Sequence, residues 1–142
     1  MTTATMTVPR RNWWTIGLWV AQTLLAVAYL SAGSMKLFLP MDALVSMGLR
    51  YVTTMPELFI RFVGLMEILG ATGLILPSLT RILPVLTLAA AVGLSVVQVA
   101  AIILHATRGE TAMSLPVNLV LLALSLFIVW GRTKKARIAS RG

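Results

Sequence analysis

Four long apolar stretches, separated by short polar segments, dominate the pattern of residues along this chain. They cover about residues 13–34, 58–76, 82–104 and 113–131. A helix of about 20 apolar residues is long enough to cross the hydrocarbon core of a bilayer. The pattern therefore predicts an all-α polytopic membrane protein, in which a bundle of four transmembrane helices forms a single domain over residues 1–142.

The segment between the first two stretches shows apolar positions at helical spacing. Leu44, Val45, Leu49 and Val52 recur on one side of a helix, and polar residues take the other side. This pattern predicts an amphipathic interfacial helix over about residues 41–54, lying along the membrane surface. Two interpretations stay open at this point: a connector that rests on lipid, or a lid over the outer mouth of the bundle.

Composition agrees with a membrane location, and the distribution of charge predicts the orientation. Hydrophobic residues make up 58% of the chain and charged residues only 11%, whereas about a quarter of an ordinary soluble protein is charged. The side that holds the termini carries eight cations and no acid: Arg10, Arg11, Arg81, Arg132, Lys134, Lys135, Arg137 and Arg141. Because such residues stay on the cytoplasmic side, we expect both termini in the cytoplasm of a bacterium, the protein in its inner membrane, and a basic tail over 132–142.

Several classes of chemistry are excluded by what the sequence lacks. The chain has no cysteine, which excludes a disulfide relay, an iron–sulfur cluster and a c-type haem. Paired histidines at metal-ligand spacing are also absent, so we expect no metal site. The basic tail lacks the aromatic and base-reading residues of a nucleic-acid site, and attraction to anionic lipid is the better interpretation.

Glu67 is the most informative polar residue, because it lies near the middle of the second apolar stretch, where a carboxylate is costly. Arg61 precedes it by six positions, about 120° away around a helix, so the two side chains cannot pair. Lys36, at the outer end of the first stretch, is the expected partner, and His105 and Arg108 are competing candidates. A structural ion pair and a functional site both fit this pattern.

A candidate site follows from the polar residues that the helical pattern places in the outer half of the bundle. Its members are Lys36, Glu67, His105, Arg108, Arg61, Asn118, Tyr29 and Gln98. Such a cluster could hold the polar headgroup of a quinone or a lipid between helices. For Gln22, Ser95 and Ser125 we expect interhelical hydrogen bonds and no further role.

Three short motifs, in this order and spacing, carry a resemblance that covers nearly the whole chain. They are Ala32-Gly33-Ser34-Met35-Lys36-Leu37, Arg61-Phe62-Val63-Gly64-Leu65-Met66-Glu67-Ile68-Leu69-Gly70, and His105 followed by Arg108-Gly109-Glu110. With them the chain resembles the DoxX-like family of small membrane proteins. The resemblance implies a four-helix bundle with its termini inside. It places the family's Gly-x-x-Lys on Gly33 and Lys36, its glutamate on Glu67, and its polar end of the third span on His105 and Arg108.

The resemblance implies no single reaction. Members of the family include a subunit of a membrane thiosulfate:quinone oxidoreductase, proteins accessory to methylamine utilisation and to oxidative-stress resistance, and a chaperone for acetylcholine receptors. We predict a noncatalytic accessory or assembly factor that binds a membrane protein, another copy of itself or a lipid. The alternative is a quinone-binding membrane subunit of an oxidoreductase. A small proton-coupled transporter is less favoured. Small multidrug exporters of this size have their buried acidic residue in the first span, whereas Glu67 lies in the second.

Overall fold

The structure is a computed structural model that describes residues 12–141, apart from the side chain of Met113. Its four long helices are α1 (Trp13–Phe38), α3 (Glu57–Thr80), α4 (Val85–Thr107) and α5 (Thr111–Lys134). Each contains a stretch that is long and apolar enough to cross a membrane. The described residues contain no strand, and the predicted all-α, four-span fold is confirmed. Arg10 and Arg11, which we assigned to the cytoplasmic side, lie outside the described residues.

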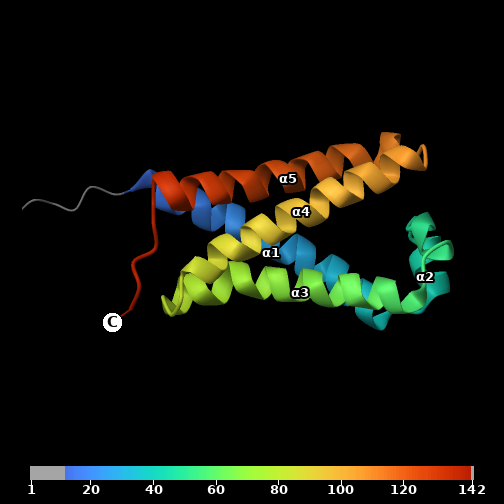
Figure 1. The fold of residues 1–142 in the computed structure, drawn as a ribbon, viewed down its shortest axis with the longest axis horizontal. Coiled ribbons are helices and arrows are strands. Elements are labelled where there is room, and N and C mark those ends of the chain that lie inside the picture. The colour runs from blue at the N-terminus through green and yellow to red at the C-terminus, as the bar shows by residue number, and fades with distance from the viewer. Residues whose placement is uncertain (1–11, 142) are drawn as a thin grey trace, which may run out of the picture.

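The four helices run side by side and form a closed arrangement (Figure 1). Helix α1 packs most extensively against α3 and also against α5, while α4 lies between α3 and α5. Leu25, Tyr29, Leu74, Leu94 and Ile128 belong to the core that they share. The start of α1, the end of α5 and the α3–α4 turn lie at one end of the bundle, which we call the inner end. The α4–α5 turn and helix α2 (Met41–Ser46) lie at the other, outer end.

The helices extend beyond the predicted apolar stretches. Helix α1 continues to Phe38, so that Lys36 lies in its last turn, and α5 continues to Lys134, so that part of the predicted basic tail is helical. Hydropathy detects only the part of a helix that must lie in hydrocarbon. Backbone hydrogen bonds can continue into the polar interface, and this explains the difference.

The segment between α1 and α3 is not the single helix that we predicted over 41–54. Helix α2 ends at Ser46, and a separate 3-10 helix, η1, covers Arg50–Thr53. Between them Gly48 has φ +96°, a left-handed conformation that glycine adopts without strain and that ends an α-helix. The apolar pattern did identify the buried side of the segment, because Leu44 and Val52 pack against Ile60 of α3.

Helices α1 and α3 approach each other closely where Gly33 faces Gly64. A Cβ atom on Gly33 would lie 2.7 Å from the carbonyl oxygen of Gly64, and one on Gly64 would lie 2.7 Å from that of Gly33. The second Cβ would also lie 2.9 Å from the Cβ atom of Lys36. Because the nearest obstructing atom at each position is a backbone carbonyl oxygen, a larger residue at either position must push the two helices apart.

We expect Gly64→Ala to lower the free energy of unfolding by about 1–3 kcal/mol, the usual cost of overpacking a tight contact. Gly17→Ala is the matched control, since a Cβ at that helical position meets nothing within 4 Å. Thermal unfolding of both variants in detergent measures the effect. If Gly64→Ala and Gly17→Ala unfold at the same temperature, the close contact between α1 and α3 is contradicted.

Candidate functional site

Lys36 and Glu67 form a buried ion pair between α1 and α3. The Lys36 Nζ atom donates to Oε1 and Oε2 of Glu67 at 2.6 and 2.7 Å. Only 8% of Lys36 and 5% of Glu67 is exposed. The pair that we predicted therefore forms, and the Gly33–Gly64 contact beside it sets the helix separation that allows both hydrogen bonds.

Arg61 joins the end of α1 to the start of α3 and does not contact Glu67, as its position on the helix predicted. Its Nη1 atom donates to the carbonyl oxygens of Lys36 and Leu39 at 2.8 and 2.7 Å. Its Nη2 atom lies 2.9 Å from Oε1 of Glu57. The carbonyls at the end of a helix lack intrahelical partners. The Arg61 guanidinium donates hydrogen bonds to these carbonyls, and its positive charge is favourable at the negative end of the helix dipole.

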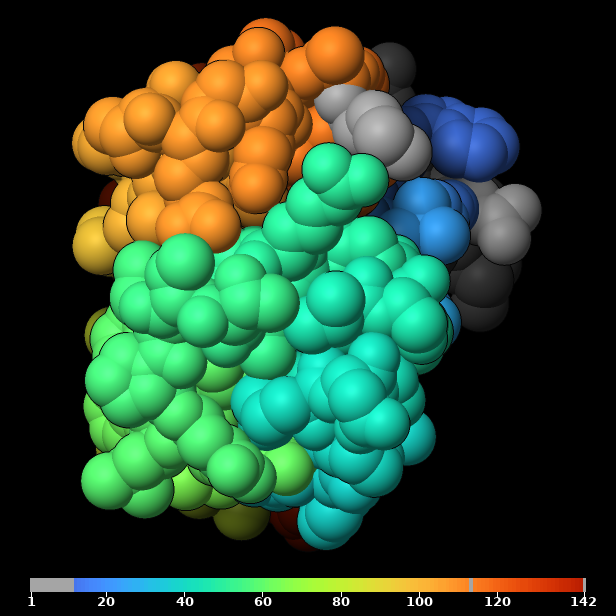
Figure 2. Space-filling model, turned by 90° about the vertical axis from the view of Figure 1, so that its right-hand side faces the viewer, coloured from blue at the N-terminus to red at the C-terminus, as the bar shows by residue number. Residues whose placement is uncertain are grey.

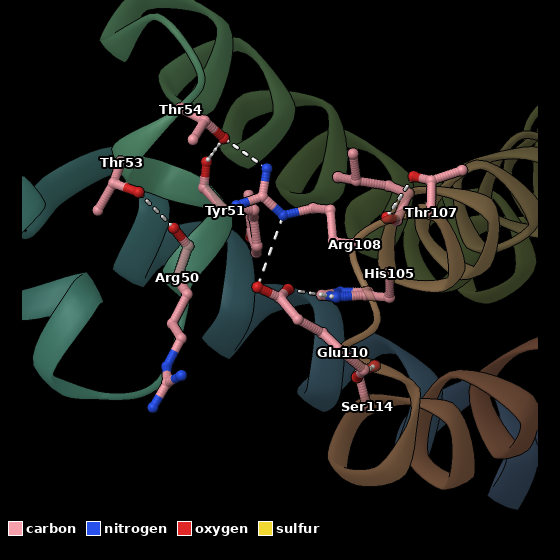
Figure 3. A network of polar contacts seen from close by, with 10 residues as sticks. Arg50, Tyr51, Thr53, Thr54, His105, Thr107, Arg108, Glu110 and Ser114 are labelled. Atoms are coloured by element: carbon pink, nitrogen blue, oxygen red, sulfur yellow. Dashed lines mark hydrogen bonds and ion pairs between the residues drawn. The ribbon is translucent and has the colours of Figure 1, made fainter.

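A second polar network lies at the outer end, and it contains the residues that we considered as competing partners of Glu67. His105 Nδ1 lies 3.3 Å and Arg108 Nε 3.5 Å from the carboxylate of Glu110. Arg108 Nη1 also donates to Oγ1 of Thr54 at 2.6 Å (Figure 3). The expectation that His105 or Arg108 pairs with Glu67 is therefore wrong, because Glu110, in the turn that follows, is the nearer carboxylate.

Tyr51, in η1, lies between the two networks. Its ring meets that of His105 edge to face, with 5.7 Å between the centroids. Burial raises the pKa of the Tyr51 phenol, and the negative charge of Glu67 raises it further. Tyr51 is therefore a neutral group within electrostatic reach of the ion pair. No pattern in the sequence assigned it to the site.

The segment from α2 to η1 covers the outer end of the bundle. Figure 2 looks onto that end and shows this segment packed across it, beside the residues of the α4–α5 turn. The Arg108–Thr54 hydrogen bond connects the two. We call this segment, residues 41–53, the cover.

Four of the predicted site residues have a buried polar atom without a hydrogen-bond partner among the described residues. These atoms are Tyr29 Oη, Gln98 Oε1, Asn118 Nδ2 and Arg108 Nε, and the last of them lies 3.5 Å from the carboxylate of Glu110. Tyr29 is 2% and Gln98 4% exposed. The Tyr29 hydroxyl lies within interaction range of Gln98 and Ser125 but forms a well-aligned hydrogen bond with neither. Unmatched buried polar atoms are rare in folded proteins and call for an explanation.

An apolar groove of about 470 Å³ runs between α4 and α5. It is lined by residues from 92–103 of α4 and from 122–129 of α5, many of them exposed valine, leucine and isoleucine side chains. Gln98 and Ser125 belong to the same two stretches but are buried. The charged residues of the predicted site do not line this groove.

Sequence reasoning missed a second buried cation, at the inner end. Arg132 was assigned to the solvated basic tail, but only 7% of it is exposed, and its Nε atom donates to Oε1 of Gln22 at 2.7 Å. Gln22 also donates to the Leu74 carbonyl and to Ser78, which agrees with its predicted role in interhelical hydrogen bonding. The extension of α5 to Lys134 explains the error, because it keeps Arg132 within the bundle.

Comparison with known proteins identifies the family. The sequence profile of the DoxX-like family matches residues 20–128, which is most of the chain and includes the whole of α3 and α4. No curated protein and no solved structure matched the sequence.

The ion pair can be tested for a structural role by a double substitution. Lys36→Met alone leaves a buried carboxylate without its cation, and we expect it to lower the free energy of unfolding by about 3–5 kcal/mol. The double variant Lys36→Met/Glu67→Leu removes both charges and is expected to recover nearly all of that loss. Unfolding of the variants in mixed micelles measures this. A double variant that is no more stable than Lys36→Met would contradict the mutual compensation.

The cover can be tested by weakening its attachment. Arg108→Ala removes the hydrogen bond to Thr54, and we expect the backbone amides of residues 41–56 to exchange with deuterium about fivefold faster, corresponding to the loss of one hydrogen bond. Arg50→Ala is the control, since that side chain points away from the network (Figure 3). If the amides of residues 41–56 exchange in Arg108→Ala at the same rate as in the unmodified protein, the attachment of the cover through Arg108 is contradicted.

Proposed function

The chain belongs to the DoxX-like family, and we propose that it acts as a noncatalytic accessory or assembly factor that binds a lipid or a membrane partner in the outer half of its bundle. Its four apolar helices and its family make it an integral membrane protein. The excess of cations at the inner end supports placing both termini in the cytoplasm of a bacterium, with the protein in the inner membrane.

The use of the charged groups favours a noncatalytic role. Lys36 and Glu67 compensate each other, Arg61 binds the end of α1, and His105 and Arg108 both bind Glu110. General acid–base catalysis needs a titratable group that can reach a substrate. Here each of these charged groups is held by a partner from the chain. The bonds of Lys36 and Arg61 connect α1 to α3, His105 and Arg108 bind Glu110 beside the α4–α5 turn, and Arg108 also bonds to Thr54.

The observation that carries the binding proposal is the pair of unmatched atoms Tyr29 Oη and Gln98 Oε1. Together they offer one hydrogen-bond donor and one acceptor without a charge, which suits an ester, hydroxyl or carbonyl group of a membrane molecule. The groove between α4 and α5 lies along the same part of α4 as Gln98 and suits a hydrocarbon chain. A lipid has a polar headgroup joined to apolar chains, so it could use both the polar atoms and the groove.

A specific observation also supports a quinone-binding membrane subunit of an oxidoreductase as the second candidate. The Tyr29 hydroxyl and the Asn118 amide nitrogen are both unmatched donors, and the carbonyl oxygens of a quinone accept hydrogen bonds. In that case a separate protein would carry the redox centre, and this chain would hold and orient the quinone.

We expect a lipid to co-purify with the protein in mild detergent and to depend on these polar atoms. Tyr29→Phe and Gln98→Leu should each retain about fivefold less of it, because each removes one hydrogen bond. Thr72→Val is the matched control, since the exposed Thr72 hydroxyl bonds only to the carbonyl of Ile68 in its own helix. Mass spectrometry of the extracted lipids and quinones gives the amounts.

A quinone that shows the same dependence would favour the second candidate. Retention that does not differ between Tyr29→Phe and Thr72→Val would contradict binding at this position. The double variant Lys36→Met/Glu67→Leu separates the two networks, because we expect it to keep the ligand. Circular dichroism of each variant checks that the helices are intact.

A further inference from the structure

Arg132 is a buried cation at the inner end of the bundle, and its hydrogen bonds are incomplete. Its Nε atom donates to Gln22, and its Nη1 atom donates to the carbonyl oxygen of Ala136 at 3.2 Å. Its Nη2 atom is buried and has no partner among the described residues. Both acceptors are neutral, so among the described residues no anionic group pairs with the guanidinium.

The chain has no acidic side chain that could reach Arg132. It contains four acids, Asp42, Glu57, Glu67 and Glu110, and all of them lie in the outer half or at the outer end. Glu67 is the nearest along α3, but it precedes Ser78, which lies beside Gln22, by eleven residues, or about 16 Å of helix. A buried charge without a partner is strongly destabilising. No acidic side chain of the sequence therefore supplies the counter-charge for Arg132.

We propose that Arg132 binds the phosphate group of an anionic phospholipid in the leaflet on the side of the termini. A guanidinium binds phosphate through two parallel hydrogen bonds, which are stronger than bonds to a neutral carbonyl. The phosphate oxygens replace the Ala136 carbonyl as acceptor for Nη1 and provide the missing acceptor for Nη2. This site is at the opposite end from the ligand that we proposed above and does not depend on it.

The surroundings of Arg132 fit an interfacial lipid headgroup. The guanidinium lies 5.5 Å from the ring centre of Trp19, and Trp14 and Trp130 pack edge to face at the same end of the bundle. Tryptophan is enriched at the level of the headgroups. These residues therefore place Arg132 near the depth of lipid phosphates.

The last described residues pass over Arg132 at the inner end. After α5 the chain crosses the inner end toward the α3–α4 turn (Figure 1), where the backbone N–H of Arg141 donates to the Arg81 carbonyl at 2.8 Å. Ala136 is buried on this path.

The test measures how strongly the full chain prefers phosphatidylglycerol to phosphatidylcholine with the same acyl chains. Immobilised protein is equilibrated with mixed micelles of the two lipids and washed in about 0.5 M NaCl, where the Debye length of roughly 4 Å suppresses diffuse attraction. Retained lipids are then quantified by mass spectrometry. Arg132→Gln is expected to lower the preference for phosphatidylglycerol about tenfold, as the loss of charge-assisted hydrogen bonds requires.

Arg137→Gln is the matched control, because Arg137 is exposed and its Nε atom donates to the Thr133 carbonyl. We expect it to keep the preference of the unmodified chain. An equal loss in both variants, or no preference in the unmodified chain, would overturn the proposal. Arg132→Lys tests the site if Arg132→Gln does not fold, because lysine keeps the charge but lacks the planar guanidinium that makes two parallel hydrogen bonds. We expect this variant to have a lower preference for phosphatidylglycerol. An unchanged preference would overturn the proposal. Displacement of the lipid by inorganic phosphate would overturn its assignment to a phospholipid.

Discussion

The outer half of this protein depends on the need to neutralise one carboxylate within a membrane. Glu67 lies in the apolar helix α3, and Lys36 of α1 donates two short hydrogen bonds to it. That geometry requires the backbones of α1 and α3 to approach closely, which Gly33 and Gly64 permit because neither carries a Cβ atom. The ion pair and the glycine contact are therefore one structural unit.

The remaining charges of the outer end extend this unit. Arg61 binds the terminal carbonyls of α1 and so fixes the place where the chain leaves the membrane helix. From there the chain passes through α2 and η1, and Arg108 and Glu110 attach this cover to the α4–α5 turn. The charged groups of this network at the outer end have opposite charges within the chain, and Tyr29 Oη, Gln98 Oε1 and Asn118 Nδ2 are neutral atoms without a hydrogen-bond partner. At the inner end the opposite holds, because Arg132 is buried where the chain has no acid.

Much of this structure could be predicted from the sequence, because each inference used a rule that acts along a single helix. Hydropathy located the four spans. The rotation of 3.6 residues per turn excluded Arg61 as the partner of Glu67 and left Lys36, His105 and Arg108 as candidates. The errors arose where the outcome depended on a few residues outside such a pattern. The positive φ angle of Gly48 ends the predicted helix early. Glu110, and not Glu67, is the carboxylate that pairs with His105 and Arg108. Because α5 continues to Lys134, Arg132 lies within the bundle and not in the tail. None of these has a periodic signal in the sequence.

The central claim is that Lys36 and Glu67 are in direct contact within the bilayer, and solid-state NMR tests it most directly. The protein is labelled with ¹⁵N at lysine Nζ and ¹³C at glutamate Cδ and reconstituted in lipid. Lys134 and Lys135 are at the inner end, and Glu57 and Glu110 at the outer end, so Lys36 and Glu67 are the one contact that these labels can report among the described residues. We predict a strong dipolar coupling, corresponding to about 3.5 Å between nitrogen and carbon in a hydrogen-bonded ion pair, which Glu67→Gln abolishes. The absence of this coupling in the unmodified protein would contradict the account.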